Sequence, residues 1–243
     1  MPVLTVGATQ IPYQVRYVAG ATRRRIVVTP EGVEVIVPAG TPLEGSDGLA
    51  GYLHRKRRWV FDAVREIEQK HQRLLTQRYA SGAKLQYRGR WLMLDVRTAD
   101  VGAVAVACRS KFHVAVPRAL EGTARLGAVR EALHDWLKTR ALSDVRRMGR
   151  RHQSALGVQA RDFRLSYSNS RWGSLARSGT VLVHWRLVQA PVAALEYVVA
   201  HEVAHLVHRH HGPEFWAALS RTLPDWAERK AMLEAWERDH RAV

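Results

Sequence analysis

Residues 201–216 read HEVAHLVHRHHGPEFW, and this stretch carries the most specific chemical pattern of the chain. His201 and His205 stand four residues apart in an apolar run, so on a helix both imidazoles project from one face. Such a pair can place two ring nitrogens about 2.0–2.1 Å from one Zn²⁺ ion. Glu202, between them, is placed to take a proton from a zinc-bound water. The pattern therefore predicts a helix that carries the zinc site of a hydrolase.

A catalytic zinc ion usually has three protein ligands and one open position for water, so a third ligand should follow the helix. We predict that this ligand is His211. Gly212 suits the end of the first helix, and Pro213 suits the first turn of the next one. A residue at such a corner can fold back toward the face that carries His201 and His205.

Other residues in the stretch remain alternatives to His211. On a continuing helix His208 would lie three residues after His205, where it is expected at the surface or in a supporting role. His210 and Glu214 lie close enough to the corner to compete for the third position. A histidine in an apolar helix is often a hydrogen-bonded core residue instead. Two buried histidines without a metal would leave polar groups that are costly to satisfy, which favours the metal site.

Three motifs of the C-terminal part extend this pattern: SRWGS at 170–174, VLVHWRLVQAP at 181–191 and EYVVAHEVAHL at 196–206. Together they closely resemble the YgjP-like metallopeptidases, which are relatives of the SprT-like and WLM zinc proteases. The resemblance implies a β-rich N-terminal part before a zincin-like catalytic domain, and so it covers nearly the whole chain. The specific motifs lie between about 160 and 225. The resemblance implies a peptidase with one zinc ion, and it places the third ligand of the family at His211.

The chain departs from the family pattern at two positions. Leu175 follows the RWGS motif where the family usually has Cys, and His184 precedes the Trp-Arg-Leu run where the family usually has Asn. Neither position is one of the three predicted ligands. The candidates for contacts with the substrate or the transition state, which the sequence does not rank, are Tyr167, Arg171 and His184. Arg171 and Trp172 also suit a structural role, as a brace and a core residue.

The remaining C-terminal segments are predicted from their apolar spacing. Residues 162–168 and 180–184 read as strands that flank the loop 170–179. In zinc proteases of this kind a strand edge beside the metal commonly aligns an extended peptide, and the resemblance suggests this hairpin as that edge. Pro191 then opens the active-site helix. Residues 213–222 and 225–239 form two amphipathic helices, with these core residues: Trp216, Leu219, Trp226, Leu233 and Trp236.

The N-terminal half reads as strands and two long helices. Alternating apolar residues in 11–38 predict a meander or hairpin that turns at Pro30-Glu31-Gly32. A long basic helix follows from a cap at Ser46 or Asp47 to about Tyr79, with Trp59-Val60-Phe61 in a core. Hairpins are expected at 84–96, turning near Arg88-Gly89, and at 103–116, before a second long helix over about 123–154. The sequence shows no internal repeat or linker.

These elements predict an α+β fold. A β-rich N-terminal region at 1–120, which contains the long basic helix at about 46–79, precedes a zincin-like domain at 121–243. No apolar run approaches the roughly 20 residues that span a bilayer, and the N-terminus lacks the layout of a secretory signal. We therefore expect a cytoplasmic protein. Cys108 is the single cysteine, which excludes an internal disulfide and favours a buried, inert thiol in a strand.

The charge is the other global feature: 38 Lys and Arg against 22 Asp and Glu give a net charge of +16. A field of this sign attracts polyanions, so non-specific DNA is a candidate partner through a basic surface. The basic residues cluster at 23–25, 55–58 and 146–151, without a motif that would organise base readout. Solvated helix faces explain most of this charge.

The sequence as a whole predicts a zinc-dependent metallopeptidase of the HExxH type, which acts on a protein or peptide. Glu202 is the predicted general base, and His201, His205 and His211 are the predicted ligands of one Zn²⁺ ion. One alternative is a nucleic-acid-associated binding module in which a structural zinc ion has a fourth protein ligand. Another is a hydrolase of a non-peptide amide, which the same residues would serve equally well.

Overall fold

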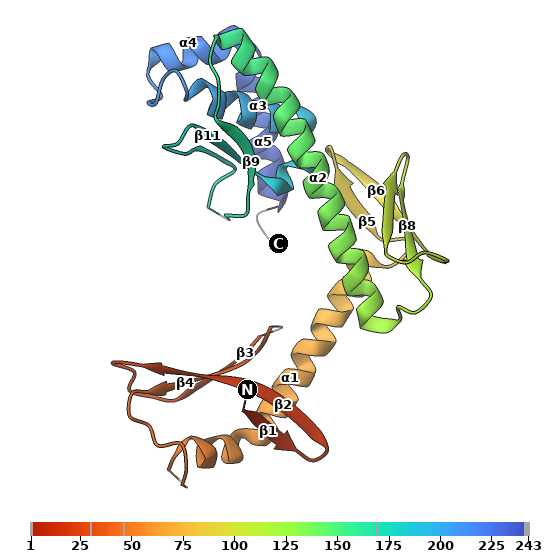
Figure 1. Cartoon of the computed structure of the whole chain (residues 1–243), viewed down its shortest axis with the longest axis vertical. Coiled ribbons are helices and arrows are strands. Elements are labelled where there is room, and N and C mark those ends of the chain that lie inside the picture. The colour runs from red at the N-terminus through yellow and green to blue at the C-terminus, as the bar shows by residue number, and fades with distance from the viewer. Residues whose placement is uncertain (1, 30, 46, 169, 241–243) are drawn as a thin grey trace. The chain divides into compact units, whose positions relative to one another are not determined.

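The computed structural model describes residues 2–29, 31–45, 47–168 and 170–240. The chain forms two compact units, Met1–Gln77 and Arg78–Val243 (Figure 1). Among the described helices, none combines the length and the apolar character that a membrane span requires.

The first unit is a four-stranded sheet followed by a long helix. Its strands are β1 (Val3–Val6), β2 (Thr9–Val18), β3 (Arg25–Thr29) and β4 (Gly32–Pro38), in the order β1-β2-β4-β3. Helix α1 (Leu49–Tyr79) packs on the sheet through buried residues such as Leu53 and Val60. The predicted hairpin is confirmed for β3 and β4, which are antiparallel, but β2 pairs parallel to β4, so the strands do not form a simple meander.

Two details of this unit differ from the prediction. Trp59 was expected in a core, but its side chain is 51% exposed, because only Val60 of the three neighbouring apolar residues points fully into the sheet. Helix α1 begins at Leu49, slightly later than the predicted cap at Ser46 or Asp47 implies. Pro30 of the predicted turn and the candidate cap Ser46 lie outside the described residues.

The second unit begins with a sheet of the same kind. Its strands are β5 (Lys84–Tyr87), β6 (Arg90–Ala99), β7 (Ala105–Cys108) and β8 (Phe112–Pro117), in the order β5-β6-β8-β7. Both predicted hairpins are confirmed, since β5 pairs antiparallel to β6 and β7 to β8. Helix α2 (Gly122–Leu156) follows. Cys108, expected to be buried, is partly exposed at the end of β7, and burial raises the pKa of its thiol.

The two sheets share one topology, an internal structural repeat that the residues of the sequence do not show. In each sheet two antiparallel hairpins are joined by a parallel central pair, and a long helix follows. The register also agrees, because Val18 lies opposite Pro38 in the first copy and Ala99 lies opposite Pro117 in the second. The two copies share few identical residues at equivalent positions. One shared feature is the sequence Val-X-Val-Pro at the ends of β4 (35–38) and β8 (114–117). A repeat that is kept in backbone pairing and not in residue identity escapes a comparison of residues.

The second sheet belongs to the same compact unit as the C-terminal helices. The unit boundary therefore falls at 77/78 and does not coincide with the boundary near 120 expected from composition. The backbone N–H groups of Arg88 and Gly89 donate to the carbonyls of Val188 and Gln189, both at 2.9 Å. The Arg88 guanidinium also binds both carboxylate oxygens of the buried Asp144 at 2.9 and 2.7 Å.

In the C-terminal part, one apolar helix packs between a small sheet and the other helices. Strands β9 (Asp162–Ser166), β10 (Gly173–Leu175) and β11 (Thr180–His184) form a sheet in the order β10-β11-β9. A short 3-10 helix, η1 (Trp185–Val188), leads to α3 (Val192–Ala204), which α4 (Pro213–Thr222) and α5 (Trp226–His240) follow. Helix α3 is apolar almost all round, and such a helix is stable only inside a core. Accordingly, every residue from Ala194 to Ala204 except His201 is buried.

The core residues predicted for α4 and α5 are largely confirmed. Leu219, Leu233 and Trp236 are buried, and Trp216 and Trp226 pack against the core while staying partly exposed.

Candidate active site

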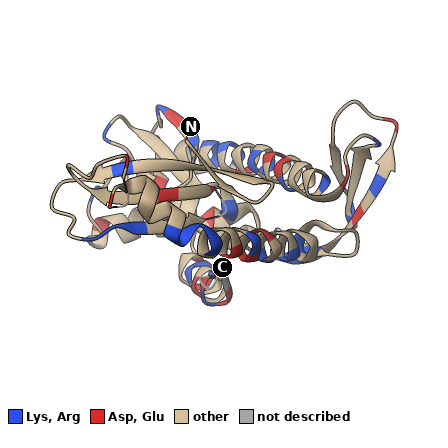
Figure 2. Cartoon of the chain, turned by 90° about the horizontal axis from the view of Figure 1, so that it is seen from below, with Lys and Arg blue, Asp and Glu red and all other residues tan. Residues whose placement is uncertain are grey.

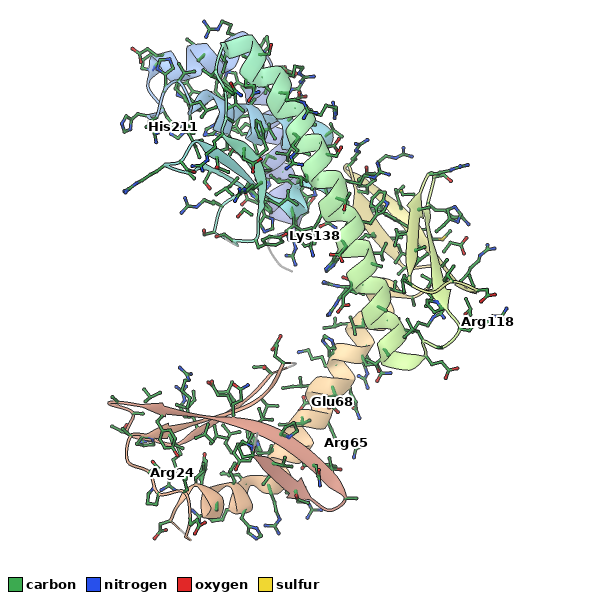
Figure 3. All side chains as sticks on the ribbon, in the orientation of Figure 1. Arg24, Arg65, Glu68, Arg118, Lys138 and His211 are labelled. Carbon is green, nitrogen blue, oxygen red and sulfur yellow. The ribbon has the colours of Figure 1, made fainter. Side chains whose placement is uncertain are left out.

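Three histidines from α3 and the following loop meet at the surface end of the helix. His201 lies in the last turn of α3, and His205 is the residue after the helix. His211, which Figure 3 labels, lies in the loop before α4. One ring nitrogen from each lies within 4.8 Å of the other two. The Nε2 atoms of His201 and His211 are 3.0 Å apart. The structure thus brings together the three histidines that the sequence singled out.

The backbone explains how the loop returns to the helix. Helix α3 ends at Ala204, and a turn closes with the His208 N–H donating to the Ala204 carbonyl at 3.1 Å. Gly212 was predicted to end this helix. It instead has extended backbone and stands as the N-terminal cap of α4, with Pro213 in the first turn. The segment between the helices is therefore a loop and not a sharp corner. Trp216 Nε1 anchors it by donating to the His211 carbonyl at 3.2 Å.

The surroundings of His205 select one tautomer of its ring. Nδ1 lies 3.0 Å from the His208 carbonyl oxygen, which can only accept a hydrogen bond. Nδ1 must therefore carry the proton, which leaves the lone pair of Nε2 available. A second hydrogen bond of this kind is the usual way in which proteins orient a metal-binding histidine. His208 contributes through its backbone, although the sequence had suggested a surface or supporting role for its side chain.

Burial keeps the rings of His201 and His205 in the neutral form that binds a metal. Burial lowers the pKa of His201 to about 3, with smaller contributions from His205 and His211, and burial also lowers the pKa of His205. Both rings are therefore neutral at pH 7. Phe215 is fully buried and packs against all three rings, with centroid distances of 4.9, 4.6 and 4.7 Å.

The donor set fits a tetrahedral metal ion. Two nitrogens bound to one tetrahedral Zn²⁺ ion would lie about 3.4 Å apart, given Zn–N bonds of about 2.0–2.1 Å. The pair His201 and His211 needs to open by only a few tenths of an ångström to reach that separation. In the described part of the chain, Nδ1 of His201 is buried without a hydrogen-bond partner. The ring is consequently held by packing and by whatever its Nε2 atom binds.

Glu202 follows His201 in α3, and its side chain lies in a nearly dry environment. Its side chain is 7% exposed, and burial raises the pKa of its carboxyl to about 7, while the charge of Arg171 acts in the opposite direction. A carboxyl group with a pKa near neutrality can both accept and return a proton at physiological pH. Buried acids whose pKa is shifted in this way cluster at functional sites.

Gly173, from the SRWGS motif, is a site residue for which sequence reasoning had found no role. A Cβ atom at this position would lie 2.6 Å from Oε1 of Glu202 and 2.8 Å from Cγ1 of Val198. Its φ is not in the left-handed region, so the requirement for glycine comes from close packing and not from backbone conformation. A glycine between two motif residues was the only signal in the sequence.

The other sequence candidates are placed less directly. Arg171 is exposed and close enough to influence Glu202. His184 is 4% exposed, and its Nδ1 accepts from the Arg186 N–H at 3.3 Å. Tyr167 is 63% exposed, just after β9. In the described part of the chain, no hydrogen bond or ring contact joins Tyr167 or His184 to the three histidines.

Comparisons with known proteins show to which family the chain belongs. A family model described as YgjP-like, metallopeptidase domain, matches residues 22–235. A search of curated proteins found no match. Among solved structures, the zymogen of the metallopeptidase abylysin from Pyrococcus abyssi is similar at 18% identity, over 40% of this chain and 95% of that one. Its TM-score of 0.36 is too low to support an argument about fold or function. Because the family model spans most of the sequence, the chain belongs to the YgjP-like metallopeptidase family.

Proposed function

We propose that the chain is a zinc-dependent peptidase in which His201, His205 and His211 hold one Zn²⁺ ion and Glu202 is the general base. The observation that carries the proposal is the convergence of ring nitrogens from three histidines within 4.8 Å, with the buried Glu202 next to His201 in the chain. A bound zinc ion would acidify a water molecule and polarise the scissile carbonyl group.

Among the protein's side chains, Glu202 carries out the proton transfers of the reaction. Its carboxylate accepts the proton of the attacking water and later returns that proton to the leaving amine. A pKa near 7 suits both steps, because the ionised and protonated forms are then similar in free energy. Gly173 lets the backbone of β10 approach the carboxylate so closely that the carboxylate has little room to move on that side.

The edge strand β10 supplies a surface on which an extended peptide can align. The His184 N–H donates to the Trp172 carbonyl at 2.7 Å, and the Ala176 N–H donates to the Thr180 carbonyl at 2.9 Å. Hydrogen-bonded pairs alternate along an antiparallel ladder, so the main-chain groups of Gly173 point away from β11. We infer that a peptide pairs with this open edge and passes beside Glu202.

The variant Glu202→Gln tests the proposal. The amide is nearly the size of the carboxylate but cannot accept the proton, so hydrolysis should fall by about 10²–10⁴-fold while zinc content stays at one equivalent. The assay follows cleavage of an unfolded protein labelled with a fluorophore, at equal zinc loading. Glu228→Gln, which changes an exposed carboxylate on α5, is the matched control and should keep full activity.

The outcomes separate the alternatives. Cleavage by Glu202→Gln at the wild-type rate would show that Glu202 is not the base. A wild-type protein that binds zinc with four protein ligands and cleaves no amide would favour a structural zinc site. Cleavage of small amides but of no peptide would favour a non-peptide amidohydrolase.

A further inference from the structure

A second pocket lies in the 78–243 unit and shares no lining residue with the histidine cluster or with β10. Its volume is about 240 Å³, and its walls come from the end of α1, from β5, β6, α2 and η1, and from α5. Pockets for drug-sized ligands usually measure about 300–1,000 Å³. The volume therefore suits a single flat group with a short polar extension.

The walls of this pocket are fixed by hydrogen bonds between distant segments. Tyr79 Oη lies 3.0 Å from Nε2 of His134, which joins the end of α1 to α2. Trp236 Nε1 donates to Gln86 Oε1 at 3.0 Å, which joins α5 to β5. The pocket is thus formed before any ligand arrives, which lowers the conformational cost of binding.

Aromatic side chains provide its flat surfaces. Trp91 on β6 is 60% exposed, whereas Tyr79 and Trp185 are buried in the wall. An exposed tryptophan at a pocket is a stacking platform for a planar ligand, and stacking of a base on an aromatic side chain contributes about 1–3 kcal/mol.

The charge of the lining is of one sign. Arg78, Lys84 and Arg186 line the pocket, and the lining contains no Asp or Glu. Within the described residues, none of these three cations forms an ion pair with a carboxylate. Lys138 on α2, labelled in Figure 3, lies over the Trp185 ring at 6.0 Å but already pairs with Asp135. By contrast, Figure 2 shows the other basic residues spread over many elements and interspersed with acidic ones.

Neutral polar groups complete the lining. Gln86 and Gln189 carry side-chain amides, which offer both donors and acceptors. Burial lowers the pKa of His134 to about 4, with further contributions from Arg130, Lys138 and Arg186, so its ring is neutral at pH 7. A neutral imidazole likewise has one donor and one acceptor nitrogen. The edges of nucleobases present the same mixture.

We propose that this pocket binds one nucleotide of a single-stranded nucleic acid, with its base stacked on Trp91 and its phosphates beside the three cations. An acidic peptide would use the cations but would leave the amide groups and the aromatic surface unmatched. The proposal is independent of the peptidase mechanism, because it shares no residue with that site.

The test measures fluorescence anisotropy of a fluorescein-labelled single-stranded oligonucleotide of mixed sequence, titrated with the full chain at low salt. Trp91→Ala should weaken binding by about 5-fold to 150-fold, the equivalent of one lost stacking interaction. The matched control is Trp59→Ala, since Trp59 is a similarly exposed tryptophan on the basic helix α1 and should have little effect. Equal thermal stability of both variants shows that neither result comes from unfolding.

Charge is tested in the same way. Lys84→Ala/Arg186→Ala should weaken binding more than Lys56→Ala/Arg58→Ala, although each pair removes two positive charges. Photo-crosslinking with a bromouracil-containing oligonucleotide should mark the peptide that contains Trp91. Equal losses in both tryptophan variants, no binding at about 50 mM salt, or equal competition by heparin, which has no bases, would each overturn the proposal.

Discussion

Replacing Gly173 by alanine tests the link between β10 and the proposed general base. The new Cβ atom would lie 2.6 Å from Oε1 of Glu202, whereas ordinary contact begins at 3.4 Å, so the carboxylate must retreat by roughly 0.8 Å. A displacement of about 1 Å can lower an enzymatic rate by about 10²-fold. We therefore expect kcat/KM to fall by about 10-fold to 100-fold in Gly173→Ala, with zinc content unchanged.

Two other glycines supply controls for the loss of stability. Overpacking costs typically about 1–3 kcal/mol, and Gly149→Ala should show such a cost because its Cβ would lie 2.2 Å from the Phe163 ring. Gly127→Ala, with nothing within 4 Å, should not destabilise the protein. Chemical denaturation measures the free energy of unfolding, and hydrolysis is then compared per folded, zinc-loaded molecule. On that scale Gly149→Ala and Gly127→Ala should keep wild-type activity.

A second substitution separates a direct contact from a general disturbance. The new Cβ atom would also lie 2.8 Å from Cγ1 of Val198, and Val198→Ala removes that second contact while it leaves Glu202 in place. If the loss of activity comes from the contact with Glu202, the double variant Gly173→Ala/Val198→Ala should stay as impaired as Gly173→Ala. Wild-type kcat/KM in Gly173→Ala, or recovery of activity in the double variant, would refute the reasoning.

The remaining predictions concern the histidine ligands, a partly buried ion pair and a buried histidine. His211→Ala should lower zinc affinity by at least about 10-fold, whereas His208→Ala should leave it nearly unchanged, because His208 acts through its carbonyl group; competition with a zinc-sensitive dye measures both. Arg88→Ala should cost about 1–3 kcal/mol in the free energy of unfolding, because the buried Asp144 loses two hydrogen bonds, and urea denaturation checks this. Burial, with help from nearby arginines, lowers the pKa of His152 from 6.5 to about 4. The unfolded chain then binds the extra proton first, so stability should fall as the pH drops from about 6.5 to 4, and the slope should be smaller in His152→Gln.

The histidine cluster could be predicted because its information is local. Two of the histidines form an i, i+4 pair on an apolar helix, and the third follows the first by ten residues. Few backbone angles separate them, so their relative positions depend mainly on local structure. The end of α3 was harder to predict, because His205 to His208 have no helix-breaking residue. After the helix ends, the His208 carbonyl accepts a hydrogen bond from the His205 ring instead of from the backbone, and this contact favours the turn.

Long-range pairing was the part that the sequence did not reveal. Alternating apolar residues identified most strands, but they carry no information on which strand pairs parallel to which. The parallel pair of β2 and β4 depends on register between residues 20 apart, and the corresponding pair of β6 and β8 depends on register between residues 18 apart. The role of Gly173 likewise depends on a contact with Glu202 across two elements, and a single sequence contains no trace of that contact.

The hydrogen bond between Gln86 and Trp236 has a consequence for the order in which the protein matures. The two residues are 150 positions apart, and the bond joins the second sheet to α5. During synthesis at about 5–20 residues per second, roughly 8–30 s separate the emergence of the two partners from the ribosome. The hairpins and α2 contain mainly local contacts and can form in that interval. Helix α3 packs against α5, so its surroundings are completed only once α5 has been made. A nascent chain should therefore acquire its hydrolytic activity late, well after its N-terminal modules have folded.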